Sequence, residues 1–548
     1  MGVKVVTVLG LALGVMAMWP AAPVVHTQAP TCQVTTSQGD VSGVDRGGSC
    51  AFLGVPFGAS PTGDLRWRPP LAPPAWAPAT LNATIPPPAC GAGAQGSEDC
   101  LKLNIWAPYR ATGSPKPVIV WLHPGSFFAA SANLSAQNGE RLAEETGTII
   151  VAPNYRLGPL GFLAHEAFRT DDPSYPTAGN YGFLDQRLAL QWVRDHIADF
   201  GGDPTRITVA GQSAGGLSVS LHLVAPDSWG LFDRAIMQGG FASYRWRTRA
   251  DGATQGEAFA TQLGCTDPAT VLPCLRGKTR NEILGALPTG TEQFAEDART
   301  HWSPVVDGFV IPDQPRTLFE VGAFSQVPVI IGSNRDEGWT FVNRSFPDTA
   351  TGPYEMTEEQ YELAVSTEFG ADAQAILAAY PPSDYGNKPK EALSKLVDDA
   401  EYACGASRLA RLIGRHQVTV YLYSLHYSIA NLMSGRAFHG LDINMVFGNN
   451  FGPPSPPHVL TPDDEAMFRI VSGYWTRFAA TGNPNIDEPN VVLWPAFKHP
   501  VGPGRGADKY LILDKTTQEA LRLRETQCAF WEPYFFRSIT AAVPAHTP

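Results

Sequence analysis

A serine flanked by glycines is the residue of this chain whose type and spacing most clearly suggest chemistry. In the segment VAGQSAGGLSV, Ser213 stands between Gly211 and Gly215. G-x-S-x-G is the pattern of a nucleophile elbow, a sharp strand-to-helix turn that projects a serine hydroxyl. RITVAG (206–211) predicts the strand, and GGLSVSLHLV (215–224) predicts the helix. We therefore expect Ser213 at a helix N-terminus, where partial positive charge favours a developing anion.

A serine nucleophile needs a base, and the base needs an acid that orients it. In enzymes built on such an elbow, the partners follow in the order serine, acid, histidine. Asp336 and Glu337 come directly after the strand-like run VPVIIGSN (327–334), and His439 lies in the loop-like segment GRAFHGLDINMVFG. From the residues alone either acid fits, and His439 is one of twelve histidines that could instead be a hydrogen-bonded loop residue.

The elements around these residues read as alternating strands and helices. Apolar runs bounded by turn residues predict strands buried on both faces. These runs are PVIVWLH (117–123), GTIIVAPNYR (147–156), RITVAG, VPVIIGSN and VTVYLYSL (418–425). Helical patterns cover 185–200, which begins on Asp185 and ends before two glycines, and 463–482. Strands alternating with helices predict a mostly parallel sheet covered on both sides.

Length and charge narrow the class of protein. The chain has 548 residues, 44% of them hydrophobic, which is enough for one large α/β domain or for two to three smaller ones. Its formal net charge of −12 argues against a nucleic-acid partner, because such proteins present basic surfaces to phosphates. No repeat of fixed period and no long charge block stands out.

The N-terminus predicts a targeting segment. Lys4 precedes the apolar stretch VVTVLGLALGVMAMW, and a region rich in small residues and proline follows. This pattern indicates a signal peptide over 1–29, cleaved between Ala21 and Ala29, and hence secretion to an extracellular or periplasmic location. A membrane anchor is the alternative, but about 15 apolar residues are short for a bilayer that needs about 20. No later segment reads as a membrane span, and the C-terminus shows no signal for a lipid anchor.

Cysteine and asparagine usage fits the secretory route. Eight cysteines allow 105 pairings, so their spacing leaves the connectivity open. No C-x-x-C pair suggests zinc or redox chemistry, and we expect neither a metal ion nor a cofactor. Asn82, Asn133 and Asn343 stand in sequons for glycosylation.

Several long segments, in order, carry a resemblance to a known family. They are EDCLKLNIW (98–106), NYRLGPLGFL (154–163), GNYGFLDQRLALQWV (179–193) and FGGDPTRITVAGQSAGG (200–216). The chain resembles the type-B carboxylesterase and cholinesterase family of α/β hydrolases. The resemblance implies the α/β-hydrolase fold, with a mostly parallel central sheet, helices on both faces and long loop insertions that form a gorge. It covers a single domain over 30–540, followed by a short tail over 541–548.

The resemblance also implies roles for individual residues. Ser213 becomes the nucleophile, Glu337 rather than Asp336 the triad acid, and His439 the base. The oxyanion hole, which binds the negative oxygen of the tetrahedral intermediate, would be formed by the backbone N–H groups of three residues. These are Gly125, Ser126 and Ala214. Ser126 must then adopt a backbone shape that the family usually leaves to glycine.

The family's disulfide pattern can be carried over in the same way. It would join Cys90 to Cys100, Cys265 to Cys274, and Cys404 to Cys528. Cys32 and Cys50 are left over, and we expect them to pair and to staple the N-terminal strands.

The chain departs from the family pattern beside the triad. Gln212 stands where the family usually has glutamate, and Gly239 stands where it usually has serine. Some members, including juvenile hormone esterases, also carry glutamine, so catalysis is compatible with it and neutral drift is an alternative explanation. Asp442, shortly after His439, is a further candidate near the triad.

Around the expected substrate site, the chain differs from cholinesterases at several residues. These differences suggest that its substrate is not a choline ester. The loop CGAGAQGSEDC (90–100) has no aromatic residue, whereas cholinesterases hold a tryptophan there for cation–π binding. Ala298 and Thr300 stand where cholinesterases have phenylalanines, which predicts a roomier acyl pocket. The candidate lining residues of the gorge or acyl pocket are Trp302, Trp339 and Phe341, although ordinary packing is an alternative for Trp339.

We therefore expect a secreted serine carboxylic-ester hydrolase that works through an acyl-enzyme. Its substrate would be a small-molecule ester, and its type a broad carboxylesterase or lipase-like enzyme rather than a cholinesterase. We expect no nucleic-acid partner and no membrane span after signal removal, and the sequence does not indicate the oligomeric state. The alternative is a non-catalytic, cholinesterase-like adhesion protein, but such members usually lack a triad residue and carry an anchor.

Overall fold

The centre of the fold is a sheet whose middle strands run parallel. In the computed structural model, eleven strands of the described part of the chain form this sheet. From edge to edge they are β14 (Gln518–Leu521), β13 (Lys509–Leu513), β12 (Val420–Leu425), β11 (Val329–Asn334), β10 (Arg234–Gln238), β9 (Gly202–Gln212), β7 (Lys116–Leu122), β8 (Ile149–Pro153), β6 (Lys102–Pro108), β4 (Ser49–Pro56) and β3 (Val44–Asp45). The strands from β13 to β8 pair in parallel, and the pairs beyond β8 and β13 are antiparallel. The predicted mostly parallel sheet is confirmed.

The structure describes most of the chain after the predicted signal peptide. The described residues are 1–2, 32–91, 96–109, 114–173, 175–287, 302–348, 352–430, 432–450, 458–489, 491–497 and 508–534. The cleavage region 21–29, the tail 541–548, Ala298 and Thr300 lie outside them. Residues Cys32–Pro548 group into one compact unit. Within the described ranges, no helix combines the length and the apolar character needed to cross a bilayer.

The central strands are apolar throughout because each of their faces packs against a separate core. On β7, Val118 and Val120 point into one core, whereas Ile119 and Trp121 point into the other. The same alternation on β10 sends Met237 to the first core. Side chains alternate between the two faces of a strand, so a strand with helices on both sides must be apolar at every position.

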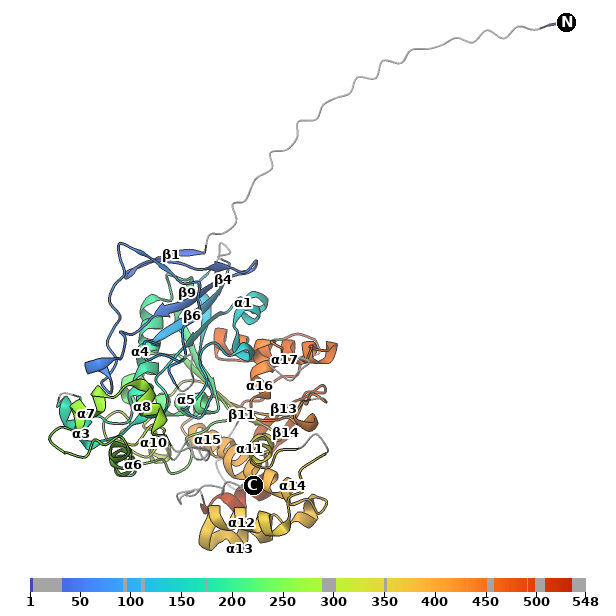
Figure 1. Cartoon of the computed structure of the whole chain (residues 1–548). Helices are drawn as coiled ribbons and strands as arrows, with labels where there is room; N and C mark the ends of the chain where they lie inside the picture. The colour runs from blue at the N-terminus through green and yellow to red at the C-terminus, as the bar shows by residue number, and fades with distance from the viewer. Residues whose placement is uncertain are drawn as a thin grey trace. The chain divides into compact units, whose positions relative to one another are not determined.

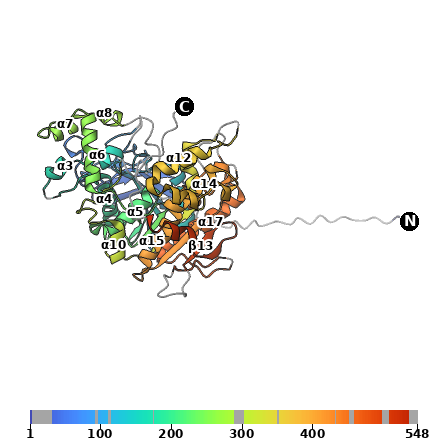
Figure 2. The same ribbon diagram turned by 90° about the horizontal axis from the view of Figure 1, so that it is seen from below.

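Helices form the layers on both sides of the sheet. The first core takes side chains from α2, α4, α5, α6 and α15, and the second takes them from α1, α16 and α17. Figure 1 shows α4 and α5 on the opposite side of the sheet from α1 and α17. A third core joins α12, α13, α14 and α18, and Figure 2 shows α12 and α14 side by side. The elements therefore stack as helix, sheet and helix, with an added helical cluster.

The helices are α1 (Glu140–Thr146), α2 (Gly158–Phe162), α3 (Glu166–Asp171), α4 (Tyr181–His196), α5 (Ala214–Val224), α6 (Arg249–Gln262), α7 (Val271–Gly277), α8 (Arg280–Gly285), α10 (Pro315–Val321), α11 (Glu337–Ser345), α12 (Glu358–Phe369), α13 (Ala373–Ala379), α14 (Pro389–Val397), α15 (Cys404–Gly414), α16 (Leu441–Phe447), α17 (Pro462–Thr481) and α18 (Glu525–Trp531). A π-helix, η6 (Asp398–Ala403), joins α14 to α15. Short 3₁₀ turns are η1 (Gly63–Leu65), η2 (Ser135–Gln137), η3 (Pro226–Ser228), η4 (Gly370–Asp372), η5 (Pro382–Tyr385) and η7 (Met433–Gly435). A small second sheet contains β1 (Gln33–Thr36), β2 (Gly39–Ser42) and β5 (Thr80–Asn82).

The start of α4 corrects the prediction that this helix begins on Asp185. The helix begins at Tyr181 and ends at His196, so Asp185 lies inside it. The Asp185 carboxylate is fully buried and receives Nε and Nη2 of Arg156 at 2.8 and 2.7 Å. A buried charge needs a partner of this kind, and the acid here serves the ion pair rather than the helix end.

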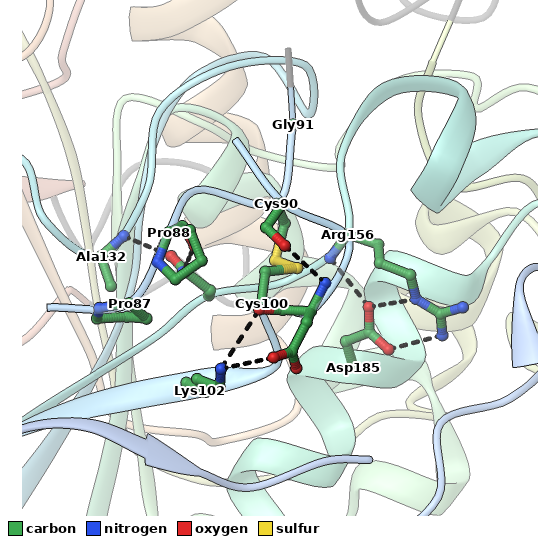
Figure 3. The surroundings of a disulfide bond; sticks show 12 residues. Pro87, Pro88, Cys90, Gly91, Cys100, Lys102, Ala132, Arg156 and Asp185 are labelled. Carbon is green, nitrogen blue, oxygen red and sulfur yellow. Dashed lines mark hydrogen bonds and ion pairs between the residues drawn. A yellow bond between two sulfur atoms is a disulfide. The ribbon is translucent and has the colours of Figure 1, made fainter. Parts of the chain in front are cut away.

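Four disulfides use all eight cysteines. They are Cys32–Cys50, Cys90–Cys100, Cys265–Cys274 and Cys404–Cys528, the pairs expected from the sequence. Figure 3 shows Cys90–Cys100 close to the buried pair of Arg156 and Asp185. The short loop between Cys90 and Cys100 is thus attached to the core at both of its ends.

The three sequons differ in the surroundings of their asparagines. Asn82 ends β5 with its residue exposed. The Asn133 side chain donates to the carbonyl of Pro87 and accepts from Asn104 at 3.0 Å. The Asn343 oxygen accepts from the Lys390 ammonium at 2.8 Å. Glycosylation at Asn133 would disturb existing side-chain contacts, whereas Asn82 lies open on an edge strand.

Candidate active site

Ser213 occupies the sharp turn between β9 and α5. β9 ends at Gln212 and α5 begins at Ala214, so the serine stands alone between strand and helix. Its φ of 55° and ψ of −122° lie in a region that non-glycine residues rarely adopt. The turn also needs close backbone approach, because a Cβ on Gly215 would come within 2.0 Å of the Leu122 carbonyl oxygen. The strand–turn–helix context expected for a nucleophile elbow is present.

Glu337 and His439 meet beyond the ends of two neighbouring parallel strands. β11 ends three residues before Glu337, and the loop that carries His439 follows β12. Oε2 of Glu337 lies 2.5 Å from Nδ1 of His439. The other carboxylate oxygen accepts the backbone N–H of Asn334 at 2.7 Å. The carboxylate is therefore held from one side and oriented toward the imidazole.

Asp336, the alternative acid, does not contact the histidine ring. Its carboxylate instead accepts the Lys395 ammonium at 2.6 Å and the backbone N–H of Ala437 at 3.2 Å. Asp336 also forms a parallel β-bridge with Phe438. Asp336 thereby connects the segment that carries Glu337 to the loop that carries His439 and stabilises their relative positions.

The surroundings of Glu337 increase its affinity for a proton. Burial raises the pKa of the Glu337 carboxyl well above its usual range, and the nearby Asp442 carboxyl acts in the same direction. The Asn334 N–H opposes this effect on the pKa. Asp442 itself is buried and accepts a hydrogen bond from the Tyr423 hydroxyl at 2.9 Å. The hydrogen bond with Nδ1 of His439 therefore stabilises a carboxylate that burial disfavours.

Gln212 links His439 to the serine turn. Its side-chain nitrogen lies 3.1 Å from Nε2 and 3.4 Å from Nδ1 of His439. Gly239 borders the same space, since a Cβ there would lie 3.0 Å from Glu337 Oε1 and 3.3 Å from the Gln212 nitrogen. The two positions that depart from the family pattern are therefore neighbours: Gln212 contacts His439, and a side chain at position 239 would meet Glu337.

Three backbone N–H groups near the serine are left without a protein acceptor. They belong to Gly125, Ser126 and Ala214, and no described residue accepts a hydrogen bond from any of them. Ser126 and Ala214 line one pocket together with Ser213. The φ values of Gly125 and Ser126 are 116° and 55°, so both residues are in the left-handed region. Unpaired donors beside a serine hydroxyl are what an oxyanion hole requires.

Aromatic residues and one acid complete the lining of this pocket. The aromatic residues are Phe241, Tyr244 and Tyr402, and the acid is Glu401; Leu217, Gly239 and Gly240 also line the pocket. It holds about 330 Å³ of empty space that is partly open to solvent. The sequence did not point to Glu401 or Tyr402, which reach the pocket from the π-helix η6. π-helical turns are frequent at functional sites.

The three candidate aromatic residues lie in different places. Phe341 packs against the His439 ring at a centroid distance of 4.9 Å, and Tyr402 covers the same ring at 5.2 Å. Trp302 is buried in the first core against Phe259. Trp339 lines a separate pocket, where Lys390 and Arg436 lie over its ring. Phe341 is thus the one of the three in contact with a triad candidate, and Trp339 corresponds to the alternative of ordinary packing.

Comparison with known protein families extends these observations from the site to the whole chain. The sequence model of the carboxylesterase family matches residues 30–531. The match includes the serine turn, the segment of Glu337 and the loop of His439.

Proposed function

Because the chain belongs to the carboxylesterase family, we propose that it is a secreted serine hydrolase of carboxylic esters. One observation supports the reaction above all: His439 contacts both Glu337 and the side chain of Gln212, the residue directly before Ser213. Four disulfides and the N-terminal apolar segment support secretion. We assign the activity to one domain over 30–540.

The first half of the reaction forms an acyl-enzyme. The Ser213 oxygen attacks the ester carbonyl carbon while His439 takes the serine proton at Nε2. Glu337 accepts the hydrogen bond from Nδ1–H and stabilises the imidazolium that forms. The negative oxygen of the tetrahedral intermediate is bound by the N–H groups of Gly125, Ser126 and Ala214. Collapse of the intermediate expels the alcohol, which takes the proton from His439.

The second half releases the acid. A water molecule gives a proton to His439 and attacks the acyl carbon, passing through a second tetrahedral intermediate at the same N–H groups. The acid then leaves, and the Ser213 hydroxyl is regenerated. Water is the only co-reactant that this sequence of steps needs.

Most of the pocket lining suits an apolar acyl chain. Leu217, Phe241, Tyr244 and Tyr402 provide apolar and aromatic surface beside Ser213. The loop from Cys90 to Cys100 carries no aromatic ring that could bind a quaternary ammonium. We therefore propose a broad carboxylesterase or lipase-like enzyme.

A chain-length series of p-nitrophenyl esters, measured alongside acetylthiocholine, tests both parts of this proposal. Acyl groups of about four to eight carbons should give the highest kcat/KM, because each buried methylene contributes about 0.8 kcal/mol. We expect the best of them to exceed acetylthiocholine by about tenfold or more. The steady-state rates of one enzyme preparation on all substrates provide the comparison.

A neutral isostere separates charge recognition from size. In 3,3-dimethylbutyl acetate a carbon replaces the quaternary nitrogen of acetylcholine, and the two should be hydrolysed at similar kcat/KM. A strong preference for choline esters would contradict the proposed substrate class. Failure to hydrolyse any ester of the series would overturn the enzymatic proposal itself.

Gln212 should tune the pH dependence of the reaction. A carboxylate at this position would lie against the His439 ring and favour the imidazolium, which cannot act as the base. The Gln212→Glu variant should therefore need a higher pH for activity. We expect the acid limb of kcat/KM to move upward by about one pH unit. A pH–rate profile on a neutral ester measures the shift.

Gln212→Leu is the matched control for this prediction, because leucine has a similar volume and no charge. Its acid limb should move upward less than that of Gln212→Glu, because leucine removes the amide donor beside Nε2 but adds no charge. If the acid limb of Gln212→Glu stays in place or moves downward, residue 212 does not act on the histidine through charge.

A further inference from the structure

Each of the three unpaired N–H groups beside Ser213 belongs to a peptide whose carbonyl oxygen accepts a hydrogen bond. In a trans peptide the N–H and the preceding C=O point in opposite directions, so a held carbonyl fixes its N–H. The Ser213 carbonyl, whose peptide carries the Ala214 N–H, accepts Leu217 N–H at 2.9 Å. The Gly125 carbonyl, whose peptide carries the Ser126 N–H, accepts the N–H groups of Phe128 and Ala129, each at 2.9 Å. Backbone hydrogen bonds therefore set two of the three donors.

The third donor, the Gly125 N–H, depends on a side chain. Its peptide begins with the Pro124 carbonyl, and Nδ1 of His123 lies 2.8 Å from that oxygen. No other described group donates to the Pro124 carbonyl. Gly125 can populate many backbone conformations, so this peptide is the least constrained of the three by its own sequence.

The surroundings of His123 fix which of its ring nitrogens carries the proton. Nδ1 faces a carbonyl oxygen, which only accepts, so Nδ1 must be the protonated nitrogen. Nε2 is buried without a hydrogen-bond partner, as expected for the bare nitrogen of that tautomer. Burial lowers the pKa of His123 to about 4, so the ring is neutral at the pH of an ordinary assay.

Packing fixes the ring itself. His123 is 1% exposed and stacks on Tyr155, with the two ring centroids 4.2 Å apart and the planes inclined by 15°. The Tyr155 hydroxyl donates to the carbonyl of His123 at 2.8 Å. The ring and its own backbone are thus held by one buried tyrosine, and this arrangement leaves the Nδ1–H aimed at the neighbouring peptide.

We infer that His123 is a positioning residue of the oxyanion hole, which turns the Pro124–Gly125 peptide so that the Gly125 N–H faces the reacting carbonyl. The inference rests on the proposed ester hydrolysis and goes beyond it, since His123 belongs to no triad. The hydrogen bond from Nδ1 holds the carbonyl on the far side of the peptide. Without it the peptide can rotate, and the intermediate loses one of its three donors for part of the time.

Loss of the His123 hydrogen bond should lower the rate of the chemical step, which is measured as kcat. Removing one donor from an oxyanion hole costs about 10²–10³-fold in kcat. Releasing a donor without deleting it should cost less, so we expect kcat to fall by about 10- to 100-fold. KM should change by less than about threefold, because the donor acts mainly on the developing oxyanion rather than on the bound ester.

His123→Leu and His123→Asn form the test pair in the full-length protein. Both replacement side chains branch at Cγ, and the asparagine amide nitrogen takes nearly the position of Nδ1 and can donate to the same carbonyl. The leucine variant should lose kcat as stated, and the asparagine variant should recover most of it. A merely structural role would lower both variants in parallel with their thermal midpoints.

A transition-state analogue provides the second readout. An alkyl trifluoromethyl ketone forms a tetrahedral adduct with the serine, whereas the matching methyl ketone resembles the ground state. His123→Leu should weaken the first inhibitor by about the same factor as kcat/KM and leave the second nearly unchanged. His123→Phe, which keeps the stack on Tyr155 but cannot donate, replaces the leucine variant if that variant does not fold.

The outcomes separate this inference from the function on which it rests. Full kcat in a folded donor-free variant, or equal losses in the asparagine and donor-free variants, would overturn the role of His123 alone. A wild-type protein that hydrolyses no ester and binds no trifluoromethyl ketone would overturn the proposed function and this inference together.

Discussion

Replacement of Ser213 by alanine is expected to lower kcat/KM for a p-nitrophenyl ester by about 10⁴- to 10⁶-fold. The hydroxyl is the attacking group of the proposed reaction, and neither the helix N-terminus nor the N–H groups can replace it. The small remaining rate should come from water attack at the intact oxyanion hole. Binding of a substrate-like ketone should persist, because alanine keeps the shape of the turn.

A fluorophosphonate probe gives the complementary measurement. In the wild-type protein the probe should label Ser213 alone, as located by peptide mass mapping, and in the alanine variant it should label no serine. Ser220→Ala is the matched control on the same helix, since the Ser220 hydroxyl contacts the Gly216 carbonyl and Met237. Unchanged turnover in Ser213→Ala, or a label on another serine, would contradict the assignment.

The features that the sequence predicted well are those that depend on local pattern. The apolar runs at 117–123 and 206–211 became neighbouring parallel strands because each must bury both faces. The glycines around Ser213 marked a turn with close backbone approach, and the turn is there. β10 (Arg234–Gln238) was not among the predicted strands, since five residues with a charge at one end give little pattern.

The features that could not be predicted correctly from the sequence depend on contacts between distant segments. Asp185 reads as the acid that starts a helix, but its partner Arg156 lies 29 residues earlier in the chain. Glu401 and Tyr402 enter the pocket because a π-helix widens the turn there, and no pattern in DDAEYA predicts that geometry. Such features follow from packing across the fold rather than from spacing along the chain.

The helical period of α11 separates Trp339 from the triad candidates. Glu337 and Trp339 are two residues apart on α11, so their side chains leave the helix about 200° apart. With Glu337 directed at His439, Trp339 must point away, and it contacts Lys390 and Arg436. Phe341 is four residues after Glu337, on the same face of the helix, and it reaches the His439 ring.

Removal of the Cys404–Cys528 disulfide should cause a larger loss of stability than removal of a short-loop disulfide. The bridge closes a loop of 124 residues, and in the chain-entropy model such a loop contributes about 5 kcal/mol to the free energy of unfolding. Cys265–Cys274 closes 9 residues and contributes about 2.5 kcal/mol in the same model. Cys404→Ala/Cys528→Ala should therefore unfold at a clearly lower urea concentration than the control Cys265→Ala/Cys274→Ala.

The Cys404–Cys528 bridge should affect activity as well as stability, because it lies next to the pocket. Cys404 directly follows η6, whose Glu401 and Tyr402 line the pocket, and Cys528 anchors it to α18 near the end of the described chain. Without the bridge, Tyr402 should lose order and its contact with the His439 ring should weaken. We expect kcat/KM to fall in the long-loop variant under conditions where both variants are folded, and to stay near the wild-type value in the control. Equal midpoints and equal activities of the two variants would show that the long bridge neither restricts the unfolded chain nor holds the pocket.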